Sequence, residues 1–339
     1  MKDMQKIFVV TICSFFILFG CSKDSSRLPS TGITETDLIA IEDALEDPNT
    51  NFVSLINKIR GSVGTNGSGS KVVWSKRNNY NLGLFVSANH VYGVSTWPSF
   101  NEEFFDLFSI NNGVFGGSIM PPTNGAISLT NERVASFALY HPSIPSDATN
   151  FTVLPKDDFY LGIMDNQRII DDGMFGIYPD FVQTDSPLQM FDPNNRTLAD
   201  QTWSVPNIGD VVIAIGYPND RVTYPNGAVS SGKIYSDSEA ENIIQLLNQD
   251  MDPEGDIPYN PQVEFLANIK AVSGMSGGGV FNENGQLLGI MVRATALNGQ
   301  PILRVVRMSY IVQKLTVFFD SLPPSEKAKI EPFISGELN

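Results

Sequence analysis

Residues 274–282 read Gly-Met-Ser-Gly-Gly-Gly-Val-Phe-Asn, and the rest of the chain is best interpreted from this stretch. A flexible linker would continue polar, whereas this run passes directly into Val280 and Phe281 and then into an apolar strand at 286–292. Glycine lets the backbone approach a ligand closely and adopt conformations closed to other residues. Ser276 in such a loop can present its hydroxyl beside inward-pointing N–H groups, as acyl transfer requires. On this stretch alone a structural loop is an equally good interpretation, so the hypothesis needs a base and an acid elsewhere in the chain.

Composition narrows the class of protein. The 339 residues, 42% of them hydrophobic, include 28 Gly and 21 Pro, which indicates a globular, loop-rich chain that favours β-structure. The formal net charge of −15 argues against nucleic acid or an anionic membrane surface as a partner, because both reward Lys and Arg. A solvated acidic surface is the simplest explanation of the charge.

Cysteine and histidine are scarce. Cys13 and Cys21 both lie near the N-terminus, so the body of the chain can form neither an internal disulfide nor a thiolate metal site. His90 and His141 are the two histidines, which leaves too few ligands for a histidine-rich metal centre and two candidates for histidine-dependent catalysis. We expect no metal and no cofactor.

The N-terminus reads as a targeting segment. Residues 1–20 carry two lysines and then an apolar run of about 14 residues, which is too short for a normal membrane span and fits a signal peptide. The run ends Leu-Phe-Gly-Cys at 18–21, which resembles a bacterial lipobox, although Phe19 is bulkier than the usual residue. The resemblance implies lipid on Cys21 and a protein anchored in the bacterial cell envelope, at the outer membrane, on its periplasmic side or at the cell surface. An ordinary secretory signal cut nearby is the alternative.

The patterns beyond residue 20 predict a tether, a β-rich body and a tail. We assign 21–50 to a tether with a short helix, 51–322 to the body, and 323–339 to a polar tail. The expected elements are a helix over 36–47, strands over 55–63, 71–75, 82–87, 209–218 and 227–235, insertions at 94–135 and 236–260, and a terminal helix over 308–322. The body is expected to divide into two halves, roughly 51–190 and 191–322.

Three islands in the body follow one another in the order His, Asp, Ser. They are Phe-Val-Ser-Ala-Asn-His-Val at 85–91, Asp-Phe-Tyr-Leu-Gly-Ile at 158–163 and Gly-Met-Ser-Gly-Gly-Gly-Val-Phe at 274–281. Together they resemble the chymotrypsin-like serine proteases, in particular the bacterial HtrA-like and glutamyl endopeptidase-like branch, over roughly residues 55–320. The resemblance implies an all-β fold of two antiparallel six-stranded barrels with a C-terminal helix and a catalytic cleft between the barrels.

The same resemblance implies roles for particular residues. Ser276 would be the nucleophile, His90 the general base and then acid, and Asp158 the carboxylate that orients the imidazole. The backbone N–H groups of Gly274 and Ser276 would form the oxyanion hole. Asp157 and Asp165 are weaker alternatives for the acid.

The strand after the serine would bind substrate. Val292, Arg293 and Ala294 would pair with the substrate backbone. Arg293, with Lys270 upstream, leaves open a preference for acidic residues before the cut bond, although an arginine that points to solvent is the simpler interpretation.

Two positions depart from the family pattern, and His141 is set aside. Met275 replaces the Asp with which many animal members bind a newly cut N-terminus, so activation by that route is not expected. Gly279 replaces the usual Pro. His141 is expected to be a loop residue.

The sequence therefore predicts a serine endopeptidase that acts on a protein or peptide substrate. A catalytically silent protease fold that serves as a binding module is the alternative. A hydrolase of another ester or amide is a third hypothesis, but the α/β-hydrolase pattern is not supported, because Val280 onward reads as a strand and His precedes Ser.

Overall fold

A computed structural model describes most of the second half of the chain and separate segments of the first. The described residues are 36–46, 53–59, 63–65, 69–76, 82–92, 136–142, 153–165, 203–325 and 327. The expected signal peptide, Cys21, the tether up to residue 35 and the insertion at 94–135 lie outside them. So does most of the polar tail. In the described part of the chain, no helix is long and apolar enough to cross a membrane.

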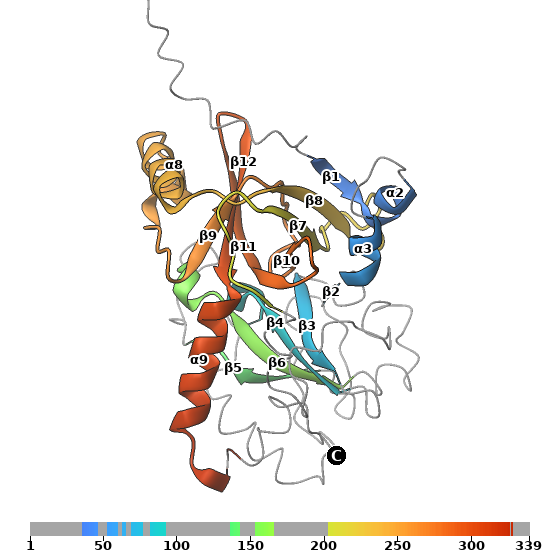
Figure 1. Cartoon of the computed structure of the whole chain (residues 1–339), viewed down its shortest axis with the longest axis vertical. Coiled ribbons are helices and arrows are strands. Elements are labelled where there is room, and N and C mark those ends of the chain that lie inside the picture. The colour runs from blue at the N-terminus through green and yellow to red at the C-terminus, as the bar shows by residue number, and fades with distance from the viewer. Residues whose placement is uncertain are drawn as a thin grey trace, which may run out of the picture. The chain divides into compact units, whose positions relative to one another are not determined.

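In the described part of the chain, twelve strands form two sheets, and every pair of neighbouring strands is antiparallel (Figure 1). The first sheet has the order β2 (Val63–Thr65), β3 (Ser70–Lys76), β4 (Leu82–Ser87), β6 (Tyr160–Asp165) and β5 (Ser136–Tyr140). The second has the order β1 (Thr36–Ala40), β8 (Ala228–Lys233), β7 (Val211–Gly216), β10 (Gly279–Asn282), β11 (Leu287–Leu297), β12 (Gln300–Arg307) and β9 (Glu264–Ala267).

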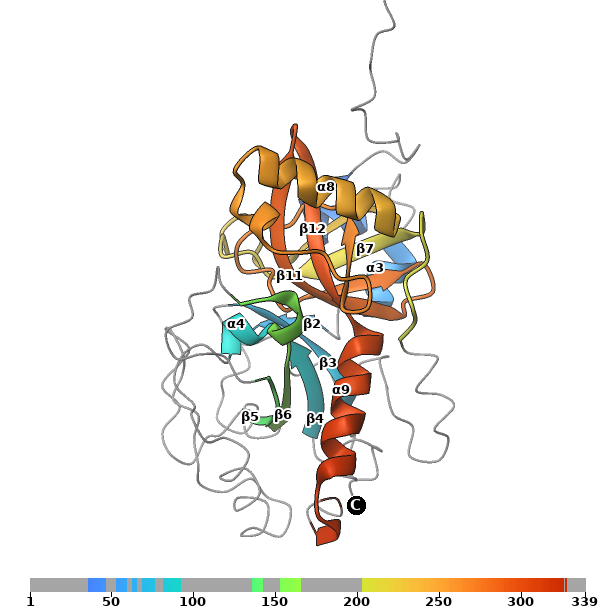
Figure 2. The same ribbon diagram turned by 90° about the vertical axis from the view of Figure 1, so that its left-hand side faces the viewer.

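The helices are few and lie at the edges of the sheets. They are α2 (Ile41–Glu46), α3 (Val53–Ile59), the single turn α4 (Asn89–Tyr92), α8 (Asp237–Gln249), α9 (Met308–Ser321) and the 3₁₀ turns η2 (Pro155–Asp157) and η6 (Pro253–Asp256). A capping box begins α8, in which Ser236 and Glu239 bond each other's backbone N–H groups. Figure 2 shows α8 and η6 beside the upper part of β11 and β12.

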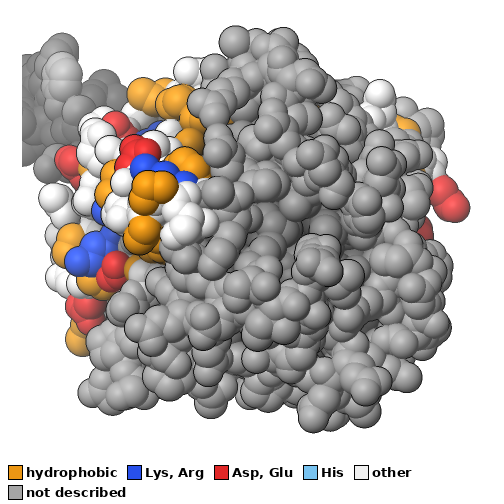
Figure 3. Space-filling model, turned by 90° about the horizontal axis from the view of Figure 1, so that it is seen from below, with side chains coloured by type: hydrophobic (Ala, Val, Ile, Leu, Met, Phe, Trp, Pro, Cys, Tyr) orange, Lys and Arg blue, Asp and Glu red, His pale blue; other side chains and the backbone are white. Residues whose placement is uncertain are grey.

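The core of the seven-stranded sheet is built from the apolar runs around the serine stretch. Val212, Val280, Leu288 and Val305, from four neighbouring strands, are fully buried in one cluster. The α9 helix joins the two sheets, because the ring of Phe318 stacks on Tyr140 of β5 with centroids 4.8 Å apart. Where the described surface is visible from below, hydrophobic side chains alternate with charges of both signs (Figure 3).

The expected strands over 71–75, 82–87, 209–218 and 227–235 and the helix over 308–322 are confirmed within a few residues at their ends. The strand expected over 55–63 is wrong. Residues 53–59 form α3, because Leu55, Ile56 and Ile59 recur at helical spacing and are buried together.

The helix expected over 36–47 is only half right. Residues 36–40 form β1, which is an edge strand of its sheet and pairs with β8, and the helix begins at Ile41. Backbone pairing with a strand far along the chain outweighs the local helical pattern here. The two sheets have seven and five strands among the described residues where six and six are expected, and neither sheet closes into a barrel there.

Candidate active site

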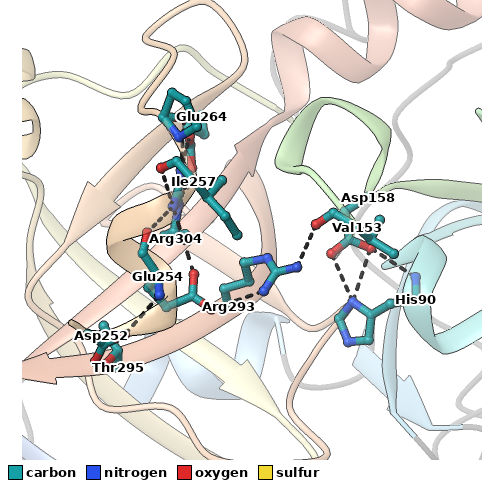
Figure 4. A network of polar contacts seen from close by, with 11 residues as sticks. His90, Val153, Asp158, Asp252, Glu254, Ile257, Glu264, Arg293, Thr295 and Arg304 are labelled. Carbon is teal, nitrogen blue, oxygen red and sulfur yellow. Dashed lines mark hydrogen bonds and ion pairs between the residues drawn. The ribbon is translucent and has the colours of Figure 1, made fainter. Parts of the chain in front are cut away.

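His90 and Asp158 meet because the strands that carry them are paired. Ser87 of β4 lies opposite Tyr160 of β6, so α4, just after β4, and η2, just before β6, lie at the same end of the sheet. The His90 Nδ1 atom lies 2.8 Å from Asp158 Oδ2 and 3.0 Å from Oδ1 (Figure 4). The His90 backbone N–H also donates to Oδ1, at 2.9 Å. The pair is held by three contacts to one carboxyl group.

Burial and charge fix the roles within the pair. The Asp158 side chain is fully buried and the His90 side chain is 13% exposed. An ionised carboxylate can only accept hydrogen bonds, so Nδ1 carries the ring proton and Nε2 is left as an acceptor. A neutral imidazole with a basic Nε2 is the form that a general base requires.

Of the three acids considered from the sequence, Asp158 is the one bonded to His90. The Asp157 carboxyl group lies 4.0 Å from the Lys156 ammonium, and its side chain is 37% exposed. Asp165 pairs with Leu82 at the opposite end of β4 and β6. Asp157 lies within η2 and Asp158 directly follows it, so the 3₁₀ turn gives the two neighbouring carboxyl groups different surroundings.

A segment that we call the acid turn, residues 153–158, presents Asp158 to His90. Inside it, the Asp157 N–H donates to Leu154 O at 2.8 Å, which closes η2. Asn89, the residue before His90, is fully buried, and its Nδ2 donates to Asp157 O at 2.9 Å. Sequence reasoning missed Asn89, because a single Asn beside a His carries no distinctive signal.

His141 lies next to the acid turn, in the loop that follows β5. Its ring stacks on Tyr160 with centroids 5.5 Å apart, and its Nδ1 donates to Pro142 O at 3.0 Å. Burial lowers the pKa of His141, and the bond to the Pro142 carbonyl raises it by a smaller amount. The Asn89 Nδ2 donates to the same Pro142 carbonyl at 3.0 Å. His141 therefore shares a hydrogen-bond acceptor with Asn89, the residue that precedes His90.

The serine loop, which we define as residues 273–278, lies against the end of β4. A Cβ atom built on Gly277 would lie 2.9 Å from the backbone N of Ala88, two residues before His90. A Cβ atom built on Gly69 would lie 2.6 Å from the Val91 side chain and 3.1 Å from Ser276 O. Ser276 and the residues that flank His90 are therefore neighbours. In the part of the chain that the structure describes, the Ser276 hydroxyl makes no hydrogen bond, and none joins it to the His90 ring.

The carbonyl groups of residues 273–276 and of Gly278 all accept hydrogen bonds. Ser273 O accepts from the Asn219 N–H at 2.9 Å, and Met275 O accepts from the Gly278 N–H at 2.9 Å. Gly274 O accepts from the Ser70 hydroxyl at 2.9 Å, and Ser276 O accepts from the Ser70 N–H at 2.8 Å. Ser70 is fully buried, and its hydroxyl also accepts from the Tyr217 N–H at 2.8 Å.

From residue 274 to residue 277, the N–H groups of the serine loop alternate between unbonded and bonded. Met275 N donates to Val272 O at 3.0 Å, and Gly277 N donates to Met291 O at 2.7 Å. Among the described residues, the N–H groups of Gly274 and Ser276 have no acceptor. Backbone donors near a protein interior are nearly always bonded. Unbonded N–H groups separated by a single residue can donate to an anionic ligand oxygen.

Two glycines of the loop have conformations that other residues avoid. Gly274 has φ +96° and Gly277 has φ +85°. A Cβ atom on Gly274 would lie 2.5–2.6 Å from Asn219 and Tyr217 atoms, so no larger residue fits.

The strand expected to bind substrate runs on past the serine loop. β10 pairs with β11 only as far as Ile290, and Met291 bonds Gly278 O and the Gly277 N–H. The register between β11 and β12 shifts between Met291 and Arg293, so Val292 sits in a bulge. Val292 is buried and Ala294 is exposed.

Arg293 does not point to solvent, so the simpler interpretation of its role is wrong. Its side chain is 6% exposed, and Nη1 lies 3.0 Å from Glu254 Oε1. Lys270 pairs with Asp37 at 3.1 Å. Both cations considered for an acidic substrate are thus bonded to carboxylates of the chain itself.

No protein-family model matches the chain, and no curated protein matches it by sequence. Among solved structures it is similar to the HtrA-type protease AlgW with a decapeptide (15% identity, TM-score 0.36), covering 75% of this chain and 52% of AlgW. It is similar to the inactive form of a mutant of Rv3671c from M. tuberculosis H37Rv, with 12% identity and a TM-score of 0.39. The similarity covers 82% of this chain and 96% of that one. It is also similar to a serine endoprotease from Yersinia pestis, with 16% identity and a TM-score of 0.39. The similarity covers 81% of this chain and 69% of that one. The chain thus spans about half the length of AlgW.

In the described residues, no group of three or more His, Cys, Asp or Glu could hold a metal ion.

Proposed function

We propose that this protein is a serine endopeptidase. The observation that carries the proposal is the combination of a His90–Asp158 pair with two unbonded N–H groups in the loop of Ser276. A base with a fixed tautomer and a pair of fixed donors beside one serine are the parts that acyl transfer uses. The proposal rests on these contacts and not on the distant structural similarities.

The mechanism follows from the atoms. The Ser276 Oγ attacks the carbonyl carbon of the scissile bond while its proton passes to His90 Nε2. The negative oxygen of the tetrahedral intermediate accepts from the Gly274 and Ser276 N–H groups. The protonated imidazole, stabilised by Asp158, then gives its proton to the leaving amine, and water hydrolyses the acyl-enzyme by the same route in reverse.

A peptide substrate fits the strand beyond the serine loop. β11 continues from Val292 to Leu297 after its pairing with β10 has ended, so an extended chain placed there would add a strand to the sheet. The exposed Ala294 leaves room for a neighbouring side chain. Anchoring through lipid on Cys21 in the bacterial cell envelope remains part of the proposal and rests on the first 21 residues alone.

A fluorophosphonate probe tests the proposal directly. We expect the wild-type protein to be labelled at Ser276, and His90→Ala to lose labelling and peptide hydrolysis by at least about 10⁴-fold, as removal of a triad member does. Ser273→Ala, in the same loop and exposed, is the matched control and is expected to be labelled normally.

A folded wild-type protein that neither reacts with the probe nor cleaves any member of a peptide library would refute the enzyme and leave the binding module. Labelling that survives Ser276→Ala would refute the assignment of the nucleophile.

A further inference from the structure

Arg293 connects three parts of the molecule that are distant in sequence. It lies on β11, its Nη1 binds Glu254 of η6 at 3.0 Å, and its Nη2 donates to Val153 O at 2.6 Å (Figure 4). Val153 is the first residue of the acid turn. One buried guanidinium therefore links the strand expected to bind substrate, the segment 237–256 and the approach to Asp158.

The acid turn is short and stiff, so its anchor at Val153 bears on the carboxylate. Four residues lie between Val153 and Asp158, and three of them form η2, which is closed by the bond from Asp157 N to Leu154 O. The Tyr310 hydroxyl of α9 donates to Lys156 O at 3.1 Å. Arg293 is the only charged side chain among the described donors to the carbonyls of this turn. Hydrogen bonds from a charged donor are stronger than neutral ones.

The guanidinium is balanced by a network that continues into the sheet. Glu254 also lies 3.8 Å from Arg304, and Arg304 binds Glu264 at 2.7 Å and 2.8 Å. Two Arg and two Glu thus share a buried, neutral cluster. Removing one member of such a cluster leaves another member with an uncompensated buried charge, which is strongly destabilising. The cluster therefore opposes any change in the position of its members.

We propose that Arg293 is a positioning residue, which sets the place of Asp158 and couples it to η6, and that it does not select substrates by charge. The proposal rests on the proposed function for its kinetic consequences. The charge of Arg293 is neutralised by Glu254, and its second nitrogen is occupied by Val153 O. A substrate carboxylate would have to displace a partner at hydrogen-bond distance from a buried group.

The two roles predict opposite kinetic patterns for Arg293→Met, which keeps the length of the side chain and removes its charge and donors. A positioning role lowers kcat on every peptide, by about tenfold to a hundredfold, because a small misplacement of a catalytic group has an effect of this size. KM stays within about threefold for acidic and neutral residues before the cut bond, because no binding contact is lost. A selectivity role instead raises KM for acidic peptides alone.

Asn248→Ala is the matched control. Asn248 lies on α8, outside the strand expected to bind substrate, and its Nδ2 donates to Gly255 O at 3.3 Å and to Asp256 Oδ1 at 3.1 Å, both in η6. The variant loosens η6 without touching Arg293, and we expect its kcat to stay near that of wild type. Should Arg293→Met fail to fold, Glu254→Gln replaces it, with an expected intermediate loss of kcat on all peptides.

A readout without catalysis separates this inference from the proposed function. The chain has two histidines, so the downfield proton signal of the His90 Nδ1–H bonded to Asp158 can be assigned against a His141→Asn variant. We expect Arg293→Met to shift or broaden this signal and Asn248→Ala to leave it unchanged, even in a protein without protease activity. An unchanged signal, equal effects of the two variants, or a loss confined to acidic peptides would overturn the inference.

Discussion

In the serine loop, the carbonyls from Ser273 to Ser276 are bonded to backbone N–H groups and to one serine, Ser70. In the acid turn, three of the six carbonyls are bonded to side chains from β11, α4 and α9. The first segment is held mainly through backbone groups, its own and those of Ser70 and Asn219, whereas the second is held through side chains of distant elements. Each way of holding a segment fails under a different kind of substitution.

A single methyl group should do the most damage in the serine loop. Gly277→Ala places a Cβ atom 2.2 Å from both Ser70 O and Ser87 Oγ, in a residue with φ +85°. We expect a loss of about 1–2 kcal/mol from the left-handed conformation and a further loss of about 1–3 kcal/mol from overlap with backbone that cannot move aside. Thermal and urea unfolding measure the loss, and the probe reports the damage at Ser276.

Gly299→Ala separates the two contributions. Gly299 has φ +79° and no atom within 4 Å of a built Cβ, so this variant should lose only the conformational part. If the two variants are destabilised equally, the serine loop can relax around the added methyl group. The fixed backbone would then no longer distinguish the serine loop from the acid turn.

The same contrast explains what sequence could predict. A loop held by backbone and glycine leaves its mark in one short stretch, and Ser276, Gly274 and the following strands could be located from it. The pairing of β4 with β6 follows from two apolar islands, which is why His90 and Asp158 could be expected to meet. The structure gives the contacts between His90 and Asp158, and the catalytic roles of the two residues are proposals.

The support of the acid turn could not be predicted. Asn89, Tyr310 and Arg293 reach it from positions whose local patterns carry no trace of it, and Arg293 was interpreted as a solvent-facing residue for that reason. Likewise β1 is a strand only because β8 offers an edge, and that information lies almost 200 residues away along the chain. Long-range contacts decide both cases.

Removing one hydroxyl sharpens the comparison, with a loss of stability of about the same size as that of Gly277→Ala. Ser70→Ala leaves the Tyr217 N–H and Gly274 C=O groups without their partner, at a cost of about 1–3 kcal/mol for each buried group. We expect the labelling rate of Ser276 to fall about tenfold, which is less than the 10²–10³ that follows loss of a whole oxyanion donor. Ser87→Ala removes the bond from the Ser87 hydroxyl to Ser70 O, at 2.6 Å, and keeps the link to Gly274. If both variants label at the same rate, the hydroxyl of Ser70 contributes only stability.

The smallest expected effect comes from pH, and it belongs to the acid turn alone. The serine loop contains no titratable side chain, whereas His141 packs beside the acid turn against Tyr160 and bonds Pro142 O. Burial lowers the pKa of His141, so the folded protein binds fewer protons than the unfolded chain below the usual histidine pKa of about 6.5. Stability from this group is therefore fully present above that pH and is lost as the pH falls below it.

We expect the melting temperature to fall by a few degrees at most between pH 7.5 and pH 5.5, and His141→Asn to remove part of that fall. The other titratable groups are common to both proteins, so the difference between the two curves isolates His141. If the two curves stay parallel, His141 takes up protons as readily in the folded protein as in the unfolded chain. His141 then gives the acid turn no dependence of stability on pH in this range, and in this respect the acid turn resembles the serine loop.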